Sequence, residues 1–187
     1  GEAEQSPQLL RHLDGYADGD GASSAGTSFP SILASTLGWD VRLATARGAG
    51  YVGDPTLLEL FTDSPGSVDP DLVLVQGGYG GGGGNDEVRS AVEELAAAVG
   101  DRYPDAHVVV LSPFGAGGTE ETAQEEGRET TKAQERTVAR TWREDPGVLV
   151  LRPLPEGWGD ALTDEWHRVL GTQLVAALRS AGLAPAV

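Results

Sequence analysis

The chain has 187 residues, of which 39% are apolar and 22% are charged, as expected for one soluble globular domain with a full hydrophobic core. Its net charge of −16 argues against binding to nucleic acid or to an anionic membrane, because phosphate contacts need clustered Lys and Arg. The absence of cysteine excludes disulfides, thiolate nucleophiles and cysteine-ligated zinc.

No apolar run approaches the roughly 18 residues of a membrane-spanning helix, and the polar N-terminal residues do not have the pattern of a signal peptide. We therefore expect a cytoplasmic protein, and secretion stays open if a leader has been removed. With no internal repeat or linker, residues 1–187 are predicted to form a single domain. The sequence indicates no cofactor.

Apolar runs that alternate with helical spacings predict strands and helices in regular succession. In chain order, the predicted strands are Leu9–Leu13, Val41–Ala44, Leu72–Gln76, His107–Leu111 and Val148–Leu151. The predicted helices are Ser28–Leu37 with Gly38 as its end, one defined by Val88, Val92, Leu95 and Val99, one near Thr131–Arg143, and Thr163–Ala181. Residues 115–131 are rich in Gly, Glu and Thr and are predicted to form a mobile loop.

This alternation predicts an α/β fold, a three-layer sandwich in which helices cover both faces of a parallel sheet of about five strands. Ligands bind such sheets outside the carboxyl ends of the strands. Residues 14–24, 77–85 and 153–162 follow predicted strands, so they are the segments in which a site is expected.

Three segments carry a resemblance to a known family. Residues 13–23 read Leu-Asp-Gly-Tyr-Ala-Asp-Gly-Asp-Gly-Ala-Ser, residues 47–51 read Arg-Gly-Ala-Gly-Tyr, and residues 70–79 read Pro-Asp-Leu-Val-Leu-Val-Gln-Gly-Gly-Tyr. Together with the helix after His167 they resemble the SGNH (GDSL-like) hydrolases over nearly the whole chain. The resemblance implies the flavodoxin-like fold of that family. It also implies a Ser nucleophile, a His base held by an Asp three residues earlier, and Gly and Asn donors to the oxyanion.

The nucleophile position of the resemblance falls on Gly15, which has no side chain that could attack a substrate. The Asn position falls on Gly80 when it is counted from the strand end, within a glycine run at 80–84. A literal Gly-Gly-Asn-Asp occurs later, at 83–86. Asn85 is then either the oxyanion donor on a lengthened loop or the N-cap of the next helix.

The last block of the resemblance can be aligned in two ways. Asp164 and His167 match the Asp-x-x-His pattern literally, although Thr163 is a good N-cap that would place both inside the last helix. The alternative aligns His167 with a second His that the family often carries in this helix. The catalytic His position then falls on Ala161 and its Asp position on Trp158.

These alignments predict a hydrolase scaffold from which the serine-hydrolase machinery has been lost. It would bind a small organic ligand or catalyse a non-hydrolytic step, such as a cyclisation, with Asp14, Tyr16 or Tyr79 as acid–base groups. The predicted ligand-binding positions are Gly15, Gly48, Gly50, Gly80, Trp158 and Ala161. Two alternatives remain: an active esterase that uses Asn85, Asp164 and His167, and a non-catalytic interaction protein. Asp14, Asp18 and Asp20 lack the spacing of a calcium loop, so no metal site is predicted.

Overall fold

The computed structural model describes residues 9–14, 24–46, 49–64, 66, 69–77, 83–112, 123–152 and 163–186. Five parallel strands form its sheet: β1 (Leu9–Asp14), β2 (Asp40–Thr45), β3 (Leu72–Gln76), β4 (His107–Leu111) and β5 (Val148–Leu151). Their order in the sheet is β2-β1-β3-β4-β5. The predicted parallel sheet and the predicted strands are confirmed, with small changes at the ends of β1 and β2.

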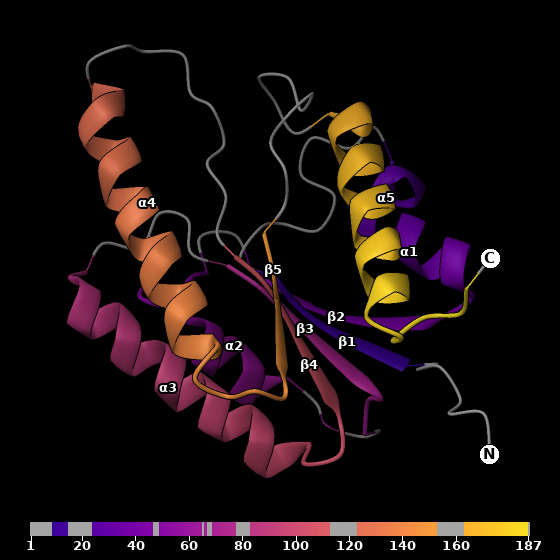
Figure 1. Ribbon diagram of the computed structural model, residues 1–187, viewed down its shortest axis with the longest axis horizontal. Coiled ribbons are helices and arrows are strands. Elements are labelled where there is room, and N and C mark those ends of the chain that lie inside the picture. Colours follow the sequence, from indigo (N-terminus) through magenta and orange to yellow (C-terminus); the bar gives the residue numbers. More distant parts are fainter. Residues whose placement is uncertain are drawn as a thin grey trace.

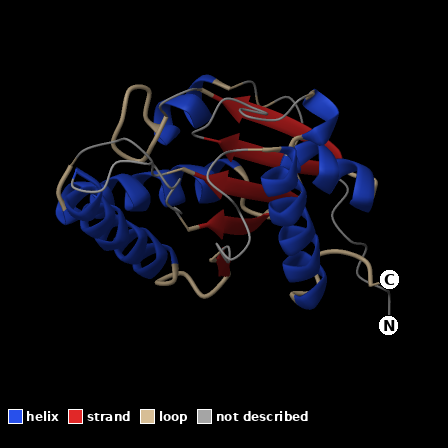
Figure 2. Cartoon of the chain, turned by 90° about the horizontal axis from the view of Figure 1, so that it is seen from above, coloured by secondary structure: helices blue, strands red, loops and turns tan. Residues whose placement is uncertain are grey.

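Helices cover both faces of the sheet (Figures 1 and 2). One layer holds α1 (Phe29–Leu37) and α5 (Asp164–Ser180), and the 3-10 helix η1 (Ala25–Thr27) lies beside them. The other layer holds α2 (Leu57–Asp63), α3 (Asn85–Arg102) and α4 (Ala123–Trp142). The three-layer α/β/α architecture predicted from the sequence is therefore confirmed.

The strands divide the hydrophobic core by the alternation of their side chains. In β3, Leu72 and Leu74 belong to the cluster beneath α1 and α5, whereas Val73 and Val75 belong to the cluster beneath α2, α3 and α4. All five residues of β3 are buried. A continuous apolar run is thus what a strand covered on both faces requires.

Two elements differ from the prediction. The short helix α2 was not predicted, although its N-terminus has a capping box in which Thr56 and Glu59 bond to each other's backbone amides. The Thr-x-x-Glu spacing before an apolar run was the signal that could have located it. Helix α4 begins at Ala123, earlier than predicted, so part of the segment expected to be a loop is helical.

Gly171 lets α5 approach α1 closely. A Cβ atom added there would lie 2.9 Å from Cγ2 of Ile32, closer than real Cβ atoms come to a neighbour, and 3.2 Å from its Cβ, tighter than most real contacts. Both atoms belong to the branch point of a β-branched side chain, which has little freedom to move aside. The absence of a side chain at Gly171 therefore fixes the separation of the two helices in this layer.

We predict that Gly171→Ala lowers the free energy of unfolding by about 1–3 kcal/mol, because the added methyl group overpacks the contact with Ile32. Gly100→Ala is the matched control. Gly100 is an exposed helical glycine in α3, and an added Cβ there meets nothing within 4 Å, so Ala should stabilise by about 0.5–1 kcal/mol. Urea unfolding of both variants tests the pair. Equal effects of the same sign would contradict the packing argument.

Candidate functional site

The strand order locates the candidate site. Strand β1 has β2 on one side and β3 on the other, so the chain reverses its direction of winding at β1 and β3. In α/β sheets of this kind ligands bind in the crevice outside the carboxyl ends at that point. The final residues of three strands lie in register there: Asp14 pairs with Thr45 of β2 and with Gln76 of β3. Asp14, a predicted acid–base group, thus ends β1 at the expected place, and only its backbone is described.

Gln76, which the sequence analysis did not single out, ends β3 at the candidate site. It is 2% exposed, and neither Oε1 nor Nε2 of its carboxamide has a hydrogen-bond partner among the residues that the structure describes. By the alternation of β3 it points to the same face as Leu72 and Leu74, beneath α1 and α5. A polar residue that ends an otherwise apolar buried strand was the signal that could have drawn attention to it.

The segment that contains Gly50 packs beside the end of β3. The Gly50 carbonyl accepts a hydrogen bond from the amide of Leu57 at 2.8 Å, and Leu57 lies so close to Gly77 that a Cβ there would be 2.6 Å from its Cδ1. The neighbouring Tyr51 accepts a hydrogen bond from Trp142 Nε1 at 3.0 Å. Burial raises the pKa of Tyr51, so the phenol stays protonated and holds α4 to this segment.

His167 lies inside the layer formed by α1 and α5. It is 3% exposed, and its Nδ1 accepts a hydrogen bond from the backbone amide of Phe29 at 3.2 Å. Its ring stacks on Phe29 with centroids 5.9 Å apart and meets Trp166 edge-on at 4.9 Å. The imidazole therefore points inward, toward the first turn of α1, rather than to the outer face of α5.

The bond to Phe29 defines which nitrogen of His167 carries the proton. An Nδ1 atom that accepts a hydrogen bond must be unprotonated, so in the neutral ring the proton is on Nε2. The base of a serine hydrolase has the opposite arrangement, in which Nδ1–H donates to a carboxylate and Nε2 removes the proton of the nucleophile. In this geometry the imidazole of His167 lacks the free Nε2 lone pair that a general base needs.

Asp164 and Thr163 begin α5. Thr163 is the N-cap and its hydroxyl oxygen accepts from the amide of Trp166, which places Asp164 in the first turn, as predicted. The Asp164 carboxylate accepts a hydrogen bond from the hydroxyl of Thr27 at 2.9 Å. Thr27 is the last residue of η1, so this hydrogen bond connects the start of α5 to η1.

Asn85 lies in the opposite layer from His167. The N-cap of α3 is Gly84, so the expectation that Asn85 is the N-cap is wrong by one residue, and Asn85 is the first residue of the helix. Its Oδ1 accepts from the hydroxyl of Thr137 at 3.3 Å, which connects α3 to α4. The three residues of the alternative esterase site thus make contacts in different layers: Asn85 with α4, and Asp164 and His167 with η1 and α1.

Several predicted site residues lie outside the described residues, so their roles stay predictions. They are Gly15, Tyr16, Gly48, Tyr79, Gly80, Trp158 and Ala161. Within the described part of the chain, no three His, Asp or Glu side chains gather as they would around a metal ion. No helix among these residues is both long enough and apolar enough to cross a membrane.

Comparison with known proteins identifies the class. The model of the GDSL-like Lipase/Acylhydrolase family matches residues 13–170. The chain therefore belongs to this family, and the resemblance seen in the sequence is confirmed. No curated protein matches the chain.

Solved structures share the fold at low sequence identity. A family two carbohydrate esterase from Clostridium thermocellum, in complex with cellohexaose, is 14% identical with a TM-score of 0.72 over 95% of this chain and 65% of that one. A salicylyl-acyltransferase from a tetracycline biosynthetic pathway is 17% identical, with a TM-score of 0.68 over 97% of this chain and 56% of its own. A putative GDSL-like lipase from Bacteroides ovatus is 14% identical, with a TM-score of 0.73 over 95% of this chain and 54% of that chain. The chain thus spans less than two thirds of the length of each of these proteins.

We predict that His167→Phe lowers the free energy of unfolding by about 1–3 kcal/mol, because it keeps an aromatic ring beside Phe29 but removes the acceptor of a buried amide. The control is His107→Phe at the exposed first residue of β4, where a change within about 0.5 kcal/mol is expected. Denaturant unfolding measures both. An unchanged stability for His167→Phe would mean that the hydrogen bond to Phe29 does not hold α5 to α1.

Proposed function

We propose that this member of the GDSL-like family has kept the hydrolase scaffold and lost the serine-hydrolase chemistry. Its site, outside the carboxyl ends of β1 and β3, would bind a small organic ligand or promote a non-hydrolytic conversion of it. The observation that carries the proposal is the state of His167. The only literal Asp-x-x-His match that the family resemblance offers has an imidazole whose Nδ1 accepts from a backbone amide, so it is not poised as a base.

The residue at the nucleophile position also supports the loss of serine-hydrolase chemistry. Gly15 stands where the family has Ser, and no hydroxyl can attack from that position. In addition, the Asp164 carboxylate bonds to Thr27 in this layer. The parts of an acyl-transfer site are thus either missing from the sequence or used in contacts between helices.

Gln76 supports a retained binding role. Leaving a buried carboxamide without partners costs free energy, and native proteins seldom do so without a functional reason. Its amide can donate and its carbonyl oxygen can accept, so it suits a ligand with a hydroxyl, carbonyl or amide group. Acid–base help from Asp14, at the end of the adjacent β1, would extend such binding to catalysis of a cyclisation or rearrangement.

The structural relatives support an organic ligand of moderate size. Two of them are a carbohydrate esterase bound to cellohexaose and a salicylyl-acyltransferase. We expect a ligand that, like theirs, offers polar oxygen atoms. A chain without a nucleophile would bind such a compound without forming an acyl-enzyme.

The first test is chemical. We predict that the purified chain shows no labelling by a fluorophosphonate probe and no hydrolysis of short acyl esters above the rate in buffer, because no serine is activated by a base. A catalytically active GDSL-like esterase serves as the positive control. Stoichiometric labelling of any serine, located by mass spectrometry, would reject the proposal and favour the esterase alternative.

The second test concerns Gln76. We predict that Gln76→Leu raises the free energy of unfolding of the ligand-free protein by about 1–3 kcal/mol, because it removes a buried polar group that has no partner among the described residues while keeping a similar volume. Gln76→Glu is the control and should destabilise, since it buries a carboxylate. Ligands found in a thermal-shift screen should then lose affinity for Gln76→Leu. A less stable Gln76→Leu protein would show that the carboxamide is a structural group.

A further inference from the structure

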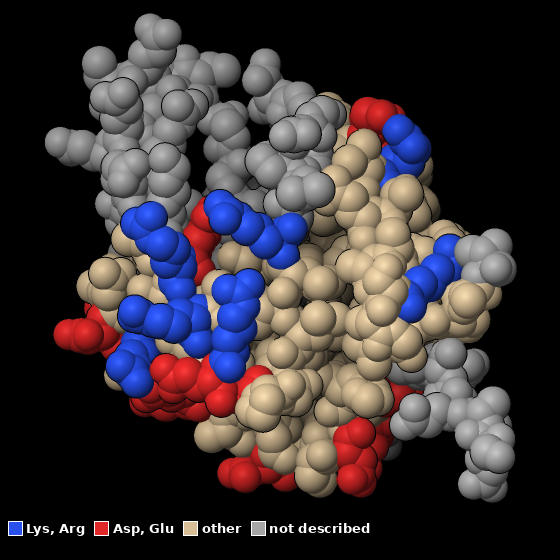
Figure 3. Space-filling model, viewed as in Figure 1, with Lys and Arg blue, Asp and Glu red and all other residues tan. Residues whose placement is uncertain are grey.

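A basic cleft lies apart from the candidate site at the carboxyl ends of β1 and β3. It is lined by Ser112, Glu135, Arg136, Ala139, Arg140, Arg143 and Arg152 and has a volume of about 440 Å³. Four of its residues are arginines, in a chain with only 13 Lys and Arg and a net charge of −16. Figure 3 shows Lys and Arg side chains gathered on this face, over the part of the molecule where Figure 1 places α4.

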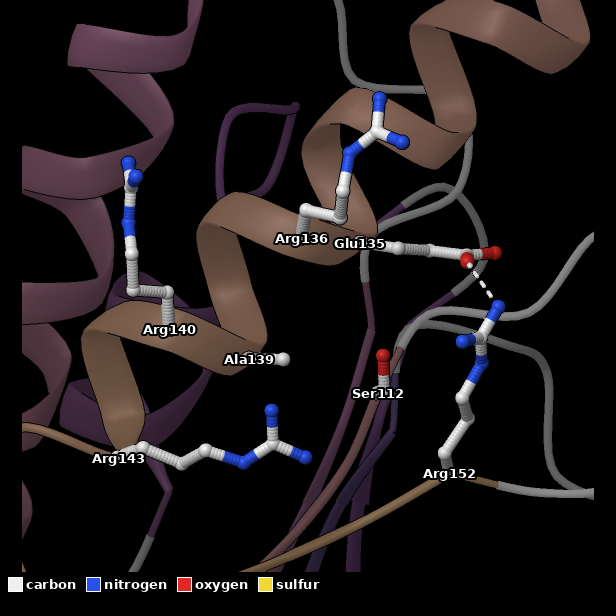
Figure 4. A pocket seen from close by; sticks show the side chains of 7 residues that line it. All are labelled: Ser112, Glu135, Arg136, Ala139, Arg140, Arg143 and Arg152. Atoms are coloured by element: carbon white, nitrogen blue, oxygen red, sulfur yellow. Dashed lines mark ion pairs between the residues drawn. The ribbon is translucent and has the colours of Figure 1, made fainter.

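The arginines reach the cleft from two sides. Arg136, Arg140 and Arg143 come from the last turns of α4 and the residue after it, and Arg152 follows directly after β5. In Figure 4 the side chain of Arg143 extends from the end of α4 toward Ser112, and Arg152 extends from the opposite wall toward Glu135, whereas Arg136 and Arg140 extend away from Ser112 at the rim. Ser112, which follows β4, is 2% exposed, so its hydroxyl lies at the bottom of the cleft.

An ion pair with Glu135 orients the Arg152 side chain on one wall of the cleft. Arg152 lies 3.8 Å from a carboxylate oxygen of Glu135, whose side chain is 14% exposed against 76% for Arg152. In contrast, Arg136, Arg140 and Arg143 form no ion pair with any residue that the structure describes. The cleft therefore holds more positive charge than its own carboxylate neutralises.

Two simpler explanations do not account for this cluster. Cations near the C-terminus of α4 interact favourably with the helix dipole, which explains Arg140 and Arg143 but not Arg152, which comes from another element. Exposed arginines also serve solubility, yet like charges three and four residues apart on a helix destabilise it. In a strongly acidic chain, charge for solubility alone would not gather the arginines around one hollow.

We propose that this cleft binds a phosphate-bearing small molecule. The planar guanidinium group offers parallel N–H donors that match two phosphate oxygens, and arginines on two opposite walls, with two more at the rim, favour a doubly charged group over a single carboxylate. The Ser112 hydroxyl supplies a neutral donor at the bottom of the cleft. The volume of the cleft suits a compound of pyrophosphate to nucleotide size.

This inference goes beyond the proposed function and is independent of it. The cleft lies beneath α4, on the face of the sheet opposite to Gln76. Gln76→Leu should leave phosphate binding unchanged, so a failure of one proposal can be told apart from a failure of the other.

Isothermal titration calorimetry on the full chain, at constant ionic strength set with sodium chloride, tests the proposal with pyrophosphate and with ADP as probes. We expect one site per chain for at least one probe. Equal affinities would mean that only the phosphates are bound, and tighter binding of ADP would mean that its organic part fills the rest of the cleft. Arg143→Gln and Arg152→Gln should each weaken binding by about tenfold or more.

Arg42→Gln and Arg168→Gln are the matched controls. Both arginines are exposed, each pairs with a nearby carboxylate, and neither lines the cleft, so the affinity should stay within about twofold, below the roughly tenfold that one contact contributes. Equal weakening by the control substitutions would mean that only the overall charge attracts the probe. That result, or binding of neither probe, would overturn the proposal. Binding of long polyanions such as heparin, without binding of pyrophosphate or ADP, would also overturn it and indicate a surface for a macromolecule.

Discussion

The hydrogen bond from the Phe29 amide to the His167 imidazole sets how one layer of this protein is assembled. It joins the first turn of α1 to the first turn of α5, and it does so inside a cluster of aromatic rings where water cannot substitute for the acceptor. Gly171, one turn further along α5, brings the same two helices to their closest approach. The Thr27–Asp164 bond adds a third connection at the carboxyl edge of the sheet. The residues that resemble a catalytic pair thus belong to a packing arrangement.

That arrangement has a chemical consequence. An imidazole can bind a backbone N–H through Nδ1 or donate from Nδ1 to a carboxylate, but a neutral ring cannot do both. A catalytic His needs the second state, since only then is Nε2 free to accept a proton from the nucleophile. The contact that stabilises the α1–α5 layer is therefore incompatible with general-base chemistry at the same residue. Under the proposed function, the same hydrogen bond both packs α1 against α5 and keeps His167 from acting as a base.

Much of the fold could be predicted from the sequence because the strands are short apolar runs. Leu72–Gln76, His107–Leu111 and Val148–Leu151 were placed to the residue, since Pro, Gly or charged residues lie within two positions of each end. Helix α2 was missed because seven residues give too little periodicity, and only its capping box could have revealed it. The predicted start of helix α4 was too late along the chain. Its first turns are rich in Glu, Thr and Gly, so few apolar residues reveal the helical period there.

The candidate site was less predictable. The sequence placed His167 inside the last helix, but which nitrogen accepts a hydrogen bond depends on where Phe29 lies, 138 residues away in the chain. Gln76 was visible as a polar residue at a strand end, yet the absence of a hydrogen-bond partner among the described residues depends on which elements pack around it. A linear pattern records residue types at fixed spacings, whereas these features arise from tertiary contacts that bring distant residues together.

The basic cleft, too, arises from tertiary contacts, which bring arginines from two separate parts of the chain together. A net charge of −16 argues against a polyanionic partner such as nucleic acid, and that inference treats the charge as spread over the molecule. Binding of a small anion depends instead on the potential within about one Debye length, roughly 8–10 Å, and arginines from the end of α4 and from the end of β5 line one cleft. The net negative charge of the chain would repel long polyanions more than a small phosphate compound. Net charge and local charge then act together, the first selecting the size of the anion and the second supplying the affinity.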